Sequence, residues 1–191
     1  MNLRQILTAP NQLTLLRMIF LPFIVINLVG HHFTSALALF VFAGLSDGLD
    51  GLLARKLHQQ TVLGQYLDPI ADKLLLSTMF LVLSIEYRVV VPWKFTVLVF
   101  SRDISILLVS GVLFMIAGLR DFRPSIFGKA NTCAQVAAVF FALLFLVNPV
   151  LWVSWALKSF LRATFAFTIL SAVHYAFLVQ QRLHAHPPTG S

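Results

Sequence analysis

Residues 47–72 read DGLDGLLARKLHQQTVLGQYLDPIAD, and this stretch joins two long apolar segments at 34–56 and 65–87. The polar run between the two segments predicts a short loop, so we expect two antiparallel helices. Each segment has the length of about 20 residues that crosses a bilayer. The stretch also holds four of the seven acidic residues of the chain, namely Asp47, Asp50, Asp68 and Asp72.

The apolar character extends over all 191 residues, of which 59% are hydrophobic and only 11% are charged. The mean hydropathy is +0.87. A soluble domain carries about 25% charged residues, so this composition excludes a soluble globule. Disordered and nucleic-acid-binding chains need more charge than this, and we expect no nucleic-acid partner. The composition therefore predicts an integral membrane protein.

The apolar segments predict an all-α membrane protein with six transmembrane helices in one bundle. The segments are separated by short polar or Gly- and Pro-containing breaks, and they cover 12–29, 34–56, 65–87, 93–118, 125–147 and 152–180. A β-barrel would need alternating segments of about ten residues, which the sequence lacks. We expect a short interfacial helix in the first ten residues and a single membrane domain over 1–191.

Lysine and arginine predict the orientation, because cytoplasmic loops are enriched in both. The amino terminus, the second and fourth loops and the carboxyl tail hold eight of them: Arg4, Arg17, Arg55, Lys56, Arg120, Arg123, Lys129 and Arg182. The opposite side holds four: Arg88, Lys94, Lys158 and Arg162. We therefore expect both termini, and the loop inside 47–72, to face the cytoplasm.

The four aspartates follow helical spacing. Asp47 and Asp50 are three residues apart, while Gly64, Asp68 and Asp72 are four apart. Each set therefore shares one helix face. At 1.5 Å per residue, the aspartates lie up to about 14 Å from the cytoplasmic helix ends. Two antiparallel helices thus present two carboxylates each at similar depth.

Four neighbouring carboxylates in a bilayer repel one another and need cations. An interhelical ionic network is one alternative, but only three cations lie nearby: Arg55, Lys56 and Lys73. All-oxygen ligands favour Mg²⁺ or Mn²⁺, and two such ions can clamp the oxygens of a diphosphate. Glycines at 48 and 51 leave room for a ligand to approach the helix. We therefore predict a cytoplasm-facing site for two divalent ions and a diphosphate substrate.

The motif as a whole resembles the signature of the CDP-alcohol phosphotransferases, the class-I CDP-alcohol phosphatidyltransferase family. The resemblance rests on eight fixed positions, all present here: Asp47, Asp50, Gly51, Ala54, Arg55, Gly64, Asp68 and Asp72. Members of the family transfer a phosphatidyl or similar group from a CDP-linked donor to an alcohol and release CMP. The six predicted helices extend the resemblance over most of the chain.

The resemblance implies a role for each motif residue. Asp47, Asp50 and Asp68 would be the principal metal ligands, with Asp72 also near the metals and acting as general base. The cytidine-diphosphate pocket would be lined by Asp50, Gly51, Ala54 and Arg55, with Gly64 leaving room for the nucleotide. The resemblance further implies CDP-diacylglycerol as donor and a homodimer.

Shorter patterns are similar to the phosphatidylglycerophosphate and cardiolipin synthase branch of this family. They are PNQLTLLR at 10–17, DPIADK at 68–73, Ser101-Arg102-Asp103, and Gly128-Lys129 followed by Thr132 and Gln135. We expect glycerol 3-phosphate as acceptor, with Arg102 and Lys129 binding its phosphate. Phosphatidylglycerol, which would make the enzyme a cardiolipin synthase, is the alternative; the Ser-Arg-Asp triplet and the aromatic last helix favour it.

Three basic residues have a second interpretation each. Arg102 and Asp103 are adjacent on a helix and so point about 100° apart, but Arg102 could still belong to a buried helix-packing pair. Lys129 could instead be ordinary positive charge on the cytoplasmic side. Arg17 either reaches the site or extends to the membrane surface.

Two other functions fit parts of the pattern. Intramembrane prenyltransferases also combine aspartate motifs with Mg²⁺, but their motifs lie far apart on a longer chain. A divalent-cation transporter would need acids along a path through the whole membrane, whereas these cluster near one side. Release of CMP from CDP-diacylglycerol separates the expected enzyme from both.

Overall fold

The computed structural model describes residues 9–57, 62–117 and 126–185, with side chains described for 16–46, 71–105, 108, 126 and 128–173. Within these ranges the chain forms helices and no strand. The helices are α2 (Ala9–Val29), α3 (Phe33–Leu57), α4 (Val62–Glu86), α5 (Trp93–Ala117), α6 (Ile126–Val147) and α7 (Leu151–Ala185). The prediction of an all-helical chain with six long helices is confirmed for the described residues.

The helix boundaries agree with the predicted segments to within five residues, and the largest difference is at the end of α7. The interfacial helix predicted for the first ten residues lies mostly outside the described residues. Its last two positions, Ala9 and Pro10, open α2, where proline is well tolerated because the first turn needs no amide donor.

Two of the described helices are long and apolar enough to cross a membrane, over Gly128–Val147 and Leu151–Val173. Shorter apolar stretches cover Leu16–Val29 and Phe33–Ser46. The second of these stops just before Asp47, the first aspartate of the motif. Six membrane crossings therefore remain a prediction.

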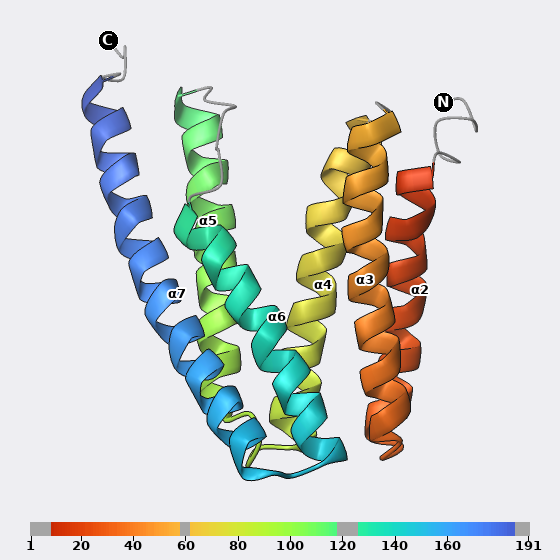
Figure 1. Ribbon diagram of the computed structural model, residues 1–191. Coiled ribbons are helices and arrows are strands. Elements are labelled where there is room, and N and C mark those ends of the chain that lie inside the picture. Colours follow the sequence, from red (N-terminus) through yellow and green to blue (C-terminus); the bar gives the residue numbers. More distant parts are fainter. Residues whose placement is uncertain (1–8, 58–61, 118–125, 186–191) are drawn as a thin grey trace.

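The helices alternate in direction, so the start of α2 and the end of α7 lie at the same end of the bundle (Figure 1). Two groups of three are visible, α2–α3–α4 and α5–α6–α7, and they diverge toward that end (Figure 1). Within the groups, α2 packs against α3 and α4, and α7 packs against α5 and α6. Contacts of α6 with α3 and α4, and of α4 with α5, join the groups. We call the end with the start of α2 and the end of α7 the motif end, because α3 ends and α4 begins at the same end.

The described apolar core lies in the other half of the bundle. It is built from the second halves of α2, α4 and α6 and the first halves of α3, α5 and α7. Its fully buried members include Ile24, Leu28, Ala36, Met79, Phe80, Leu83, Val99, Ala142 and Leu143. This core joins both groups of helices and holds them together at the end away from the motif.

The turn between α2 and α3 is a compact helix stop. The amide of His32 donates to the Asn27 carbonyl (2.8 Å), and that of His31 donates to the Leu28 carbonyl (3.1 Å). This is the Schellman arrangement, and His31 has the left-handed φ of 61° that it requires. The Schellman arrangement usually has glycine at the position of His31, whereas here Gly30 lies one residue earlier.

Tyr87, just after α4, ties this turn to the bundle. Its hydroxyl donates to the Leu28 carbonyl (2.9 Å) and lies 3.0 Å from Nδ1 of His31. Partial burial, and secondarily the neighbouring Glu86 carboxylate, raise the pKa of Tyr87. The hydroxyl therefore stays protonated and keeps this hydrogen bond at neutral and mildly alkaline pH.

Replacing Tyr87 by phenylalanine removes that bond and leaves the ring contacts with His31 and Phe33 in place. We expect Tyr87→Phe to destabilise the protein by about 1 kcal/mol, seen as a Tm lower by a few degrees in detergent. Trp93→Phe, at an exposed position, is the control and should leave Tm unchanged. Equal Tm values for Tyr87→Phe and the unmodified protein would contradict this role.

Candidate active site

The backbone carries the four motif aspartates on two consecutive helices. Asp47 and Asp50 lie in α3, and Asp68 and Asp72 lie in α4. Four residues connect Leu57 to Val62, so the facing helix ends are at most about 18 Å apart. Figure 1 shows that α3 and α4 run in opposite directions, as predicted from the sequence, whereas the predicted similar depth of the four carboxylates remains a prediction.

Side chains between 47 and 70 lie outside the described ones. The ligand roles of Asp47, Asp50 and Asp68, and the pocket roles of Gly51, Ala54, Arg55 and Gly64, therefore remain predictions. Among the described side chains, no group of three or more His, Cys, Asp or Glu could hold a metal ion.

Asp72 is the one motif carboxylate among the described side chains, and it is paired. The guanidinium of Arg17 on α2 donates to Oδ1 of Asp72 on α4. The Arg17 side chain is only 4% exposed, whereas that of Asp72 is 42% exposed. Of the two interpretations of Arg17, the structure shows the one that reaches the site. The Asp72 side chain is therefore only partly buried.

A second group of charges begins at the next residue. Lys73 Nζ lies 3.5 Å from Oδ1 of Asp103 on α5. The same oxygen accepts a hydrogen bond of 2.7 Å from Arg102, whose other terminal nitrogen lies 3.4 Å from Oγ of Ser171 on α7. This polar chain connects α4, the helix of Asp72, to α5 and α7.

The contact between Arg102 and Asp103 differs from the divergence expected for adjacent helical residues. The long arginine side chain bends back, so its terminal nitrogen reaches the neighbouring carboxylate although the Cβ directions diverge. Arg102 and Asp103 form a partly buried pair within α5, with side-chain exposures of 10% and 16%, and the contact of Arg102 that reaches another helix is the one to Ser171. Arg102 Nε remains buried without a hydrogen-bond partner. Binding of an acceptor phosphate by Arg102 stays a prediction.

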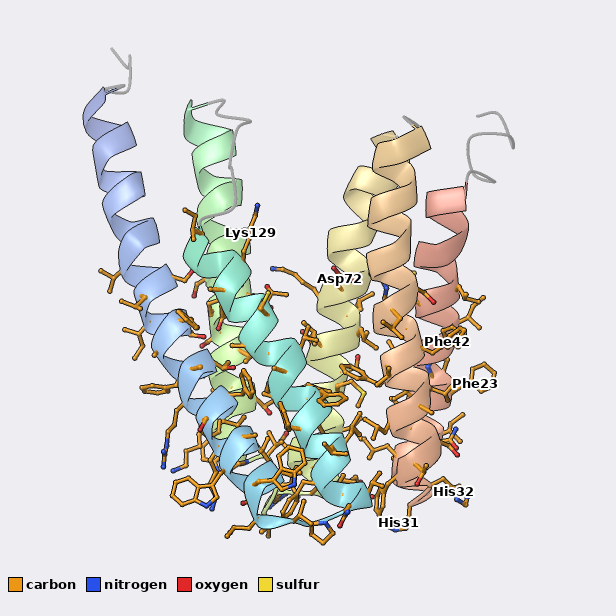
Figure 2. All side chains as sticks on the ribbon, viewed as in Figure 1. Phe23, His31, His32, Phe42, Asp72 and Lys129 are labelled. Carbon is orange, nitrogen blue, oxygen red and sulfur yellow. The ribbon has the colours of Figure 1, made fainter. Side chains whose placement is uncertain are left out.

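Lys129 lies near the start of α6 and is exposed. Figure 2 shows it in the same half of the bundle as Asp72, on the other side of the divergence between the two helix groups. No contact between the two residues is observed. Lys129 is thus positioned for either of its two predicted roles.

Sequence reasoning missed a set of buried polar side chains between α6 and α7. Asn131, Thr164 and Thr168 are at most 4% exposed, and the Thr168 hydroxyl lies 3.3 Å from Oδ1 of Asn131. Thr164 and Thr168 are four residues apart on α7, and Asn131 and Gln135 are four residues apart on α6. This spacing places each pair on one helix face and could have revealed the set. The contact between Lys73 and Asp103 was likewise not predicted.

The chain belongs to the CDP-alcohol phosphatidyltransferase family, whose model matches residues 7–178. The matched region includes the motif and all six described helices except the last seven residues of α7. This confirms the resemblance derived from the eight fixed positions. It also makes this chain a relative of membrane-bound transferases.

Individual relatives carry the names of two activities. The chain is 32% identical to a probable cardiolipin synthase (CMP-forming) of Drosophila melanogaster over 93% of its own length and 61% of that protein. It is 38% identical to the CDP-diacylglycerol–glycerol-3-phosphate 3-phosphatidyltransferase of Aquifex aeolicus, covering 66% of this chain and 70% of that protein. The protein of the same name from Pseudomonas fluorescens is 32% identical, with 88% of both chains covered. The names of both predicted activities are therefore found among the relatives.

The charged group around Asp103 can be tested by double-mutant cycles. The Arg102–Asp103 pair is largely buried, whereas Lys73 is 43% exposed and hydrated. We expect a coupling free energy of about 1–2 kcal/mol between Arg102 and Asp103, but below about 0.5 kcal/mol between Lys73 and Asp103. Arg102→Met, Lys73→Met and Asp103→Asn supply the two cycles, measured by unfolding in detergent. Equal couplings would show that burial does not set the strength of these pairs.

Proposed function

We propose that the protein transfers the phosphatidyl group of CDP-diacylglycerol to glycerol 3-phosphate, giving phosphatidylglycerophosphate and CMP. The observation that carries the proposal is the Asp72 carboxylate, which is 42% exposed and paired with Arg17 of α2. Asp72 lies on α4, which together with α3 bears the family motif. The relatives from Aquifex aeolicus and Pseudomonas fluorescens, named for this reaction, support the choice of acceptor.

The donor set fits hard divalent cations. Four carboxylates on α3 and α4 offer oxygen ligands alone, and oxygen is what Mg²⁺ and Mn²⁺ prefer. Asp47, Asp50, Asp68 and Asp72 would hold two ions. When bound, these ions neutralise the charge of the diphosphate and of the leaving CMP.

Asp72 is proposed as the general base. The acceptor hydroxyl oxygen forms a bond to the phosphatidyl phosphorus, its proton passes to the Asp72 carboxylate, and the bond from that phosphorus to the CMP oxygen breaks. A base must lie within hydrogen-bond reach of the reacting hydroxyl. Arg17 supports this by fixing the carboxylate from the adjacent helix while leaving 42% of the side chain exposed.

The remaining motif residues are proposed to bind the donor. Gly51, Ala54 and Arg55, together with Asp50, would line the cytidine-diphosphate pocket, and Gly64 would leave space for the nucleotide. Small residues allow a ligand close to the helix backbone, and an arginine suits phosphate recognition.

We propose that the acceptor phosphate binds Arg102, near the middle of α5, and Lys129, near the start of α6. A small dianionic acceptor requires concentrated positive charge, and Lys73, beside Asp72, adds to it. The alternative acceptor is phosphatidylglycerol, favoured by the similarity to the Drosophila melanogaster protein.

The same proposal includes the membrane arrangement. Six crossings would place the motif end, with both chain termini, in the cytoplasm, in agreement with the distribution of lysine and arginine. CDP-activated lipid would then reach the site from the bilayer and glycerol 3-phosphate from the cytosol. A homodimer is part of the proposal, and cross-linking in membranes would reveal it.

The reaction is tested with purified protein, CDP-diacylglycerol and Mg²⁺ or Mn²⁺, offered glycerol 3-phosphate and phosphatidylglycerol in separate assays. We expect metal-dependent CMP release with glycerol 3-phosphate. Product formation with phosphatidylglycerol alone would make the alternative correct. Absence of CMP with either acceptor would overturn the enzymatic proposal and leave the transporter alternative to be tested.

Asp72→Asn is the matched variant for this assay, because asparagine keeps the size of the side chain and an oxygen to accept from Arg17. It cannot take the proton, so we expect turnover to fall by at least about 100-fold. The variant should stay folded and bind the donor, with a lower Tm because the buried Arg17 guanidinium loses the charge of its partner. Near-normal turnover in this variant would remove Asp72 from the role of base.

A further inference from the structure

The seam between α6 and α7 is polar in one half and apolar in the other. The hydrogen bond between Thr168 and Asn131 fixes the antiparallel register of the two helices. One turn toward the core, the register brings Gln135 opposite Thr164, and both are buried. Further along, it brings Ala138 opposite Leu161 and Ala142 opposite Leu157, all buried and apolar.

The polar half continues to the motif end. One turn from Thr168, Ser171 is 2% exposed and contacts Arg102 of α5. We call these residues the polar seam: Arg102, Asn131, Gln135, Thr164, Thr168 and Ser171. Through Asp103, which contacts both Arg102 and Lys73, the polar seam reaches α4 at Lys73, the residue that follows Asp72 in the sequence.

The polar seam contains buried donors that have no acceptor in the structure. Four of its atoms are buried without a hydrogen-bond partner, namely Arg102 Nε, Asn131 Nδ2, Gln135 Nε2 and Thr164 Oγ1. Three of them are nitrogens that can only donate. Leaving such a group unpaired away from water costs about 1–3 kcal/mol, so four in one seam call for an oxygen-rich partner.

We propose that the polar seam is the subsite for the glycerol-phosphate moiety of the acceptor, with hydroxyl and phosphate oxygens accepting from these four donors. The inference rests on the proposed function and extends it from Arg102 to three uncharged residues: Asn131, Gln135 and Thr164. Free glycerol 3-phosphate and the headgroup of phosphatidylglycerol share this chemistry. The polar seam therefore recognises the part that both acceptors have in common.

A purely structural role of the polar seam predicts a different experimental result. If the polar side chains only join α6 to α7, their replacement changes stability and leaves acceptor binding unchanged. If they bind the acceptor, replacing an unpartnered donor by an apolar side chain of similar shape leaves stability equal or higher, because an unsatisfied buried group is removed. The acceptor KM then rises.

The experiment uses Thr164→Val and Gln135→Met, which keep the approximate shape of each side chain. We expect the acceptor KM to rise about fivefold to tenfold in each, as for the loss of one hydrogen bond, with the donor KM and Tm unchanged. Thr164→Ser restores the hydroxyl and should return the acceptor KM to within about twofold of the original.

The matched control is Thr96→Val. Thr96 is buried in the other half of the bundle, and its hydroxyl donates to the Phe80 carbonyl (3.0 Å). This variant should lower Tm and leave the acceptor KM unchanged.

Glycerol 3-phosphate and phosphatidylglycerol are assayed separately, so the arm in which KM rises identifies the source of the glycerol phosphate. Unchanged acceptor KM in both Thr164→Val and Gln135→Met, with CMP still released, would overturn the subsite and leave the proposed function intact. No CMP release from the unmodified protein with either acceptor would overturn the proposed function itself.

Discussion

A charge placed inside an apolar bundle must be compensated, and this constraint organises the half of the protein that carries the motif. The insertion of a carboxylate at mid-membrane costs on the order of 3 kcal/mol, and an unpaired buried charge costs more. Arg17 and Asp72 satisfy the constraint by joining α2 to α4. Asp103 satisfies it for Arg102 and Lys73 by joining α5 to α4. Compensation at these two points allows ionised groups to lie between helices of a chain that is 59% hydrophobic.

The two halves of the bundle contribute differently to the structure. Apolar packing of residues such as Phe80, Met79 and Leu143 holds the helices together away from the motif. At the motif end the two helix groups diverge (Figure 1), and the half of the bundle toward that end holds Arg17, Asp72 and Lys129 (Figure 2). An apolar core of this kind can keep the scaffold rigid while the half of the bundle at the motif end accommodates ligands.

The sequence was sufficient for the helices, for the family and for the positions of the aspartates. Long apolar segments and helical spacing are local properties, so α2 to α7 follow from them with small errors at their ends. Contacts between distant residues were harder to predict. The choice for Arg17 between the surface and the site depends on the packing of α2 against α4, and that of Arg102 depends on how its flexible side chain bends toward Asp103. The buried Asn131, Thr164 and Thr168 were missed because single polar residues in apolar helices give a weak signal unless the partner helix is known.

The central claim is that Asp47, Asp50, Asp68 and Asp72 hold two divalent ions on α3 and α4. Electron paramagnetic resonance of Mn²⁺ bound to the purified protein tests it without relying on turnover. Two ions held about 4 Å apart would give a spin-coupled spectrum with two Mn²⁺ per chain, and Asp68→Asn should abolish the coupling. Binding of Mn²⁺ that is uncoupled in the unmodified protein, or unaffected by Asp68→Asn, would contradict the account.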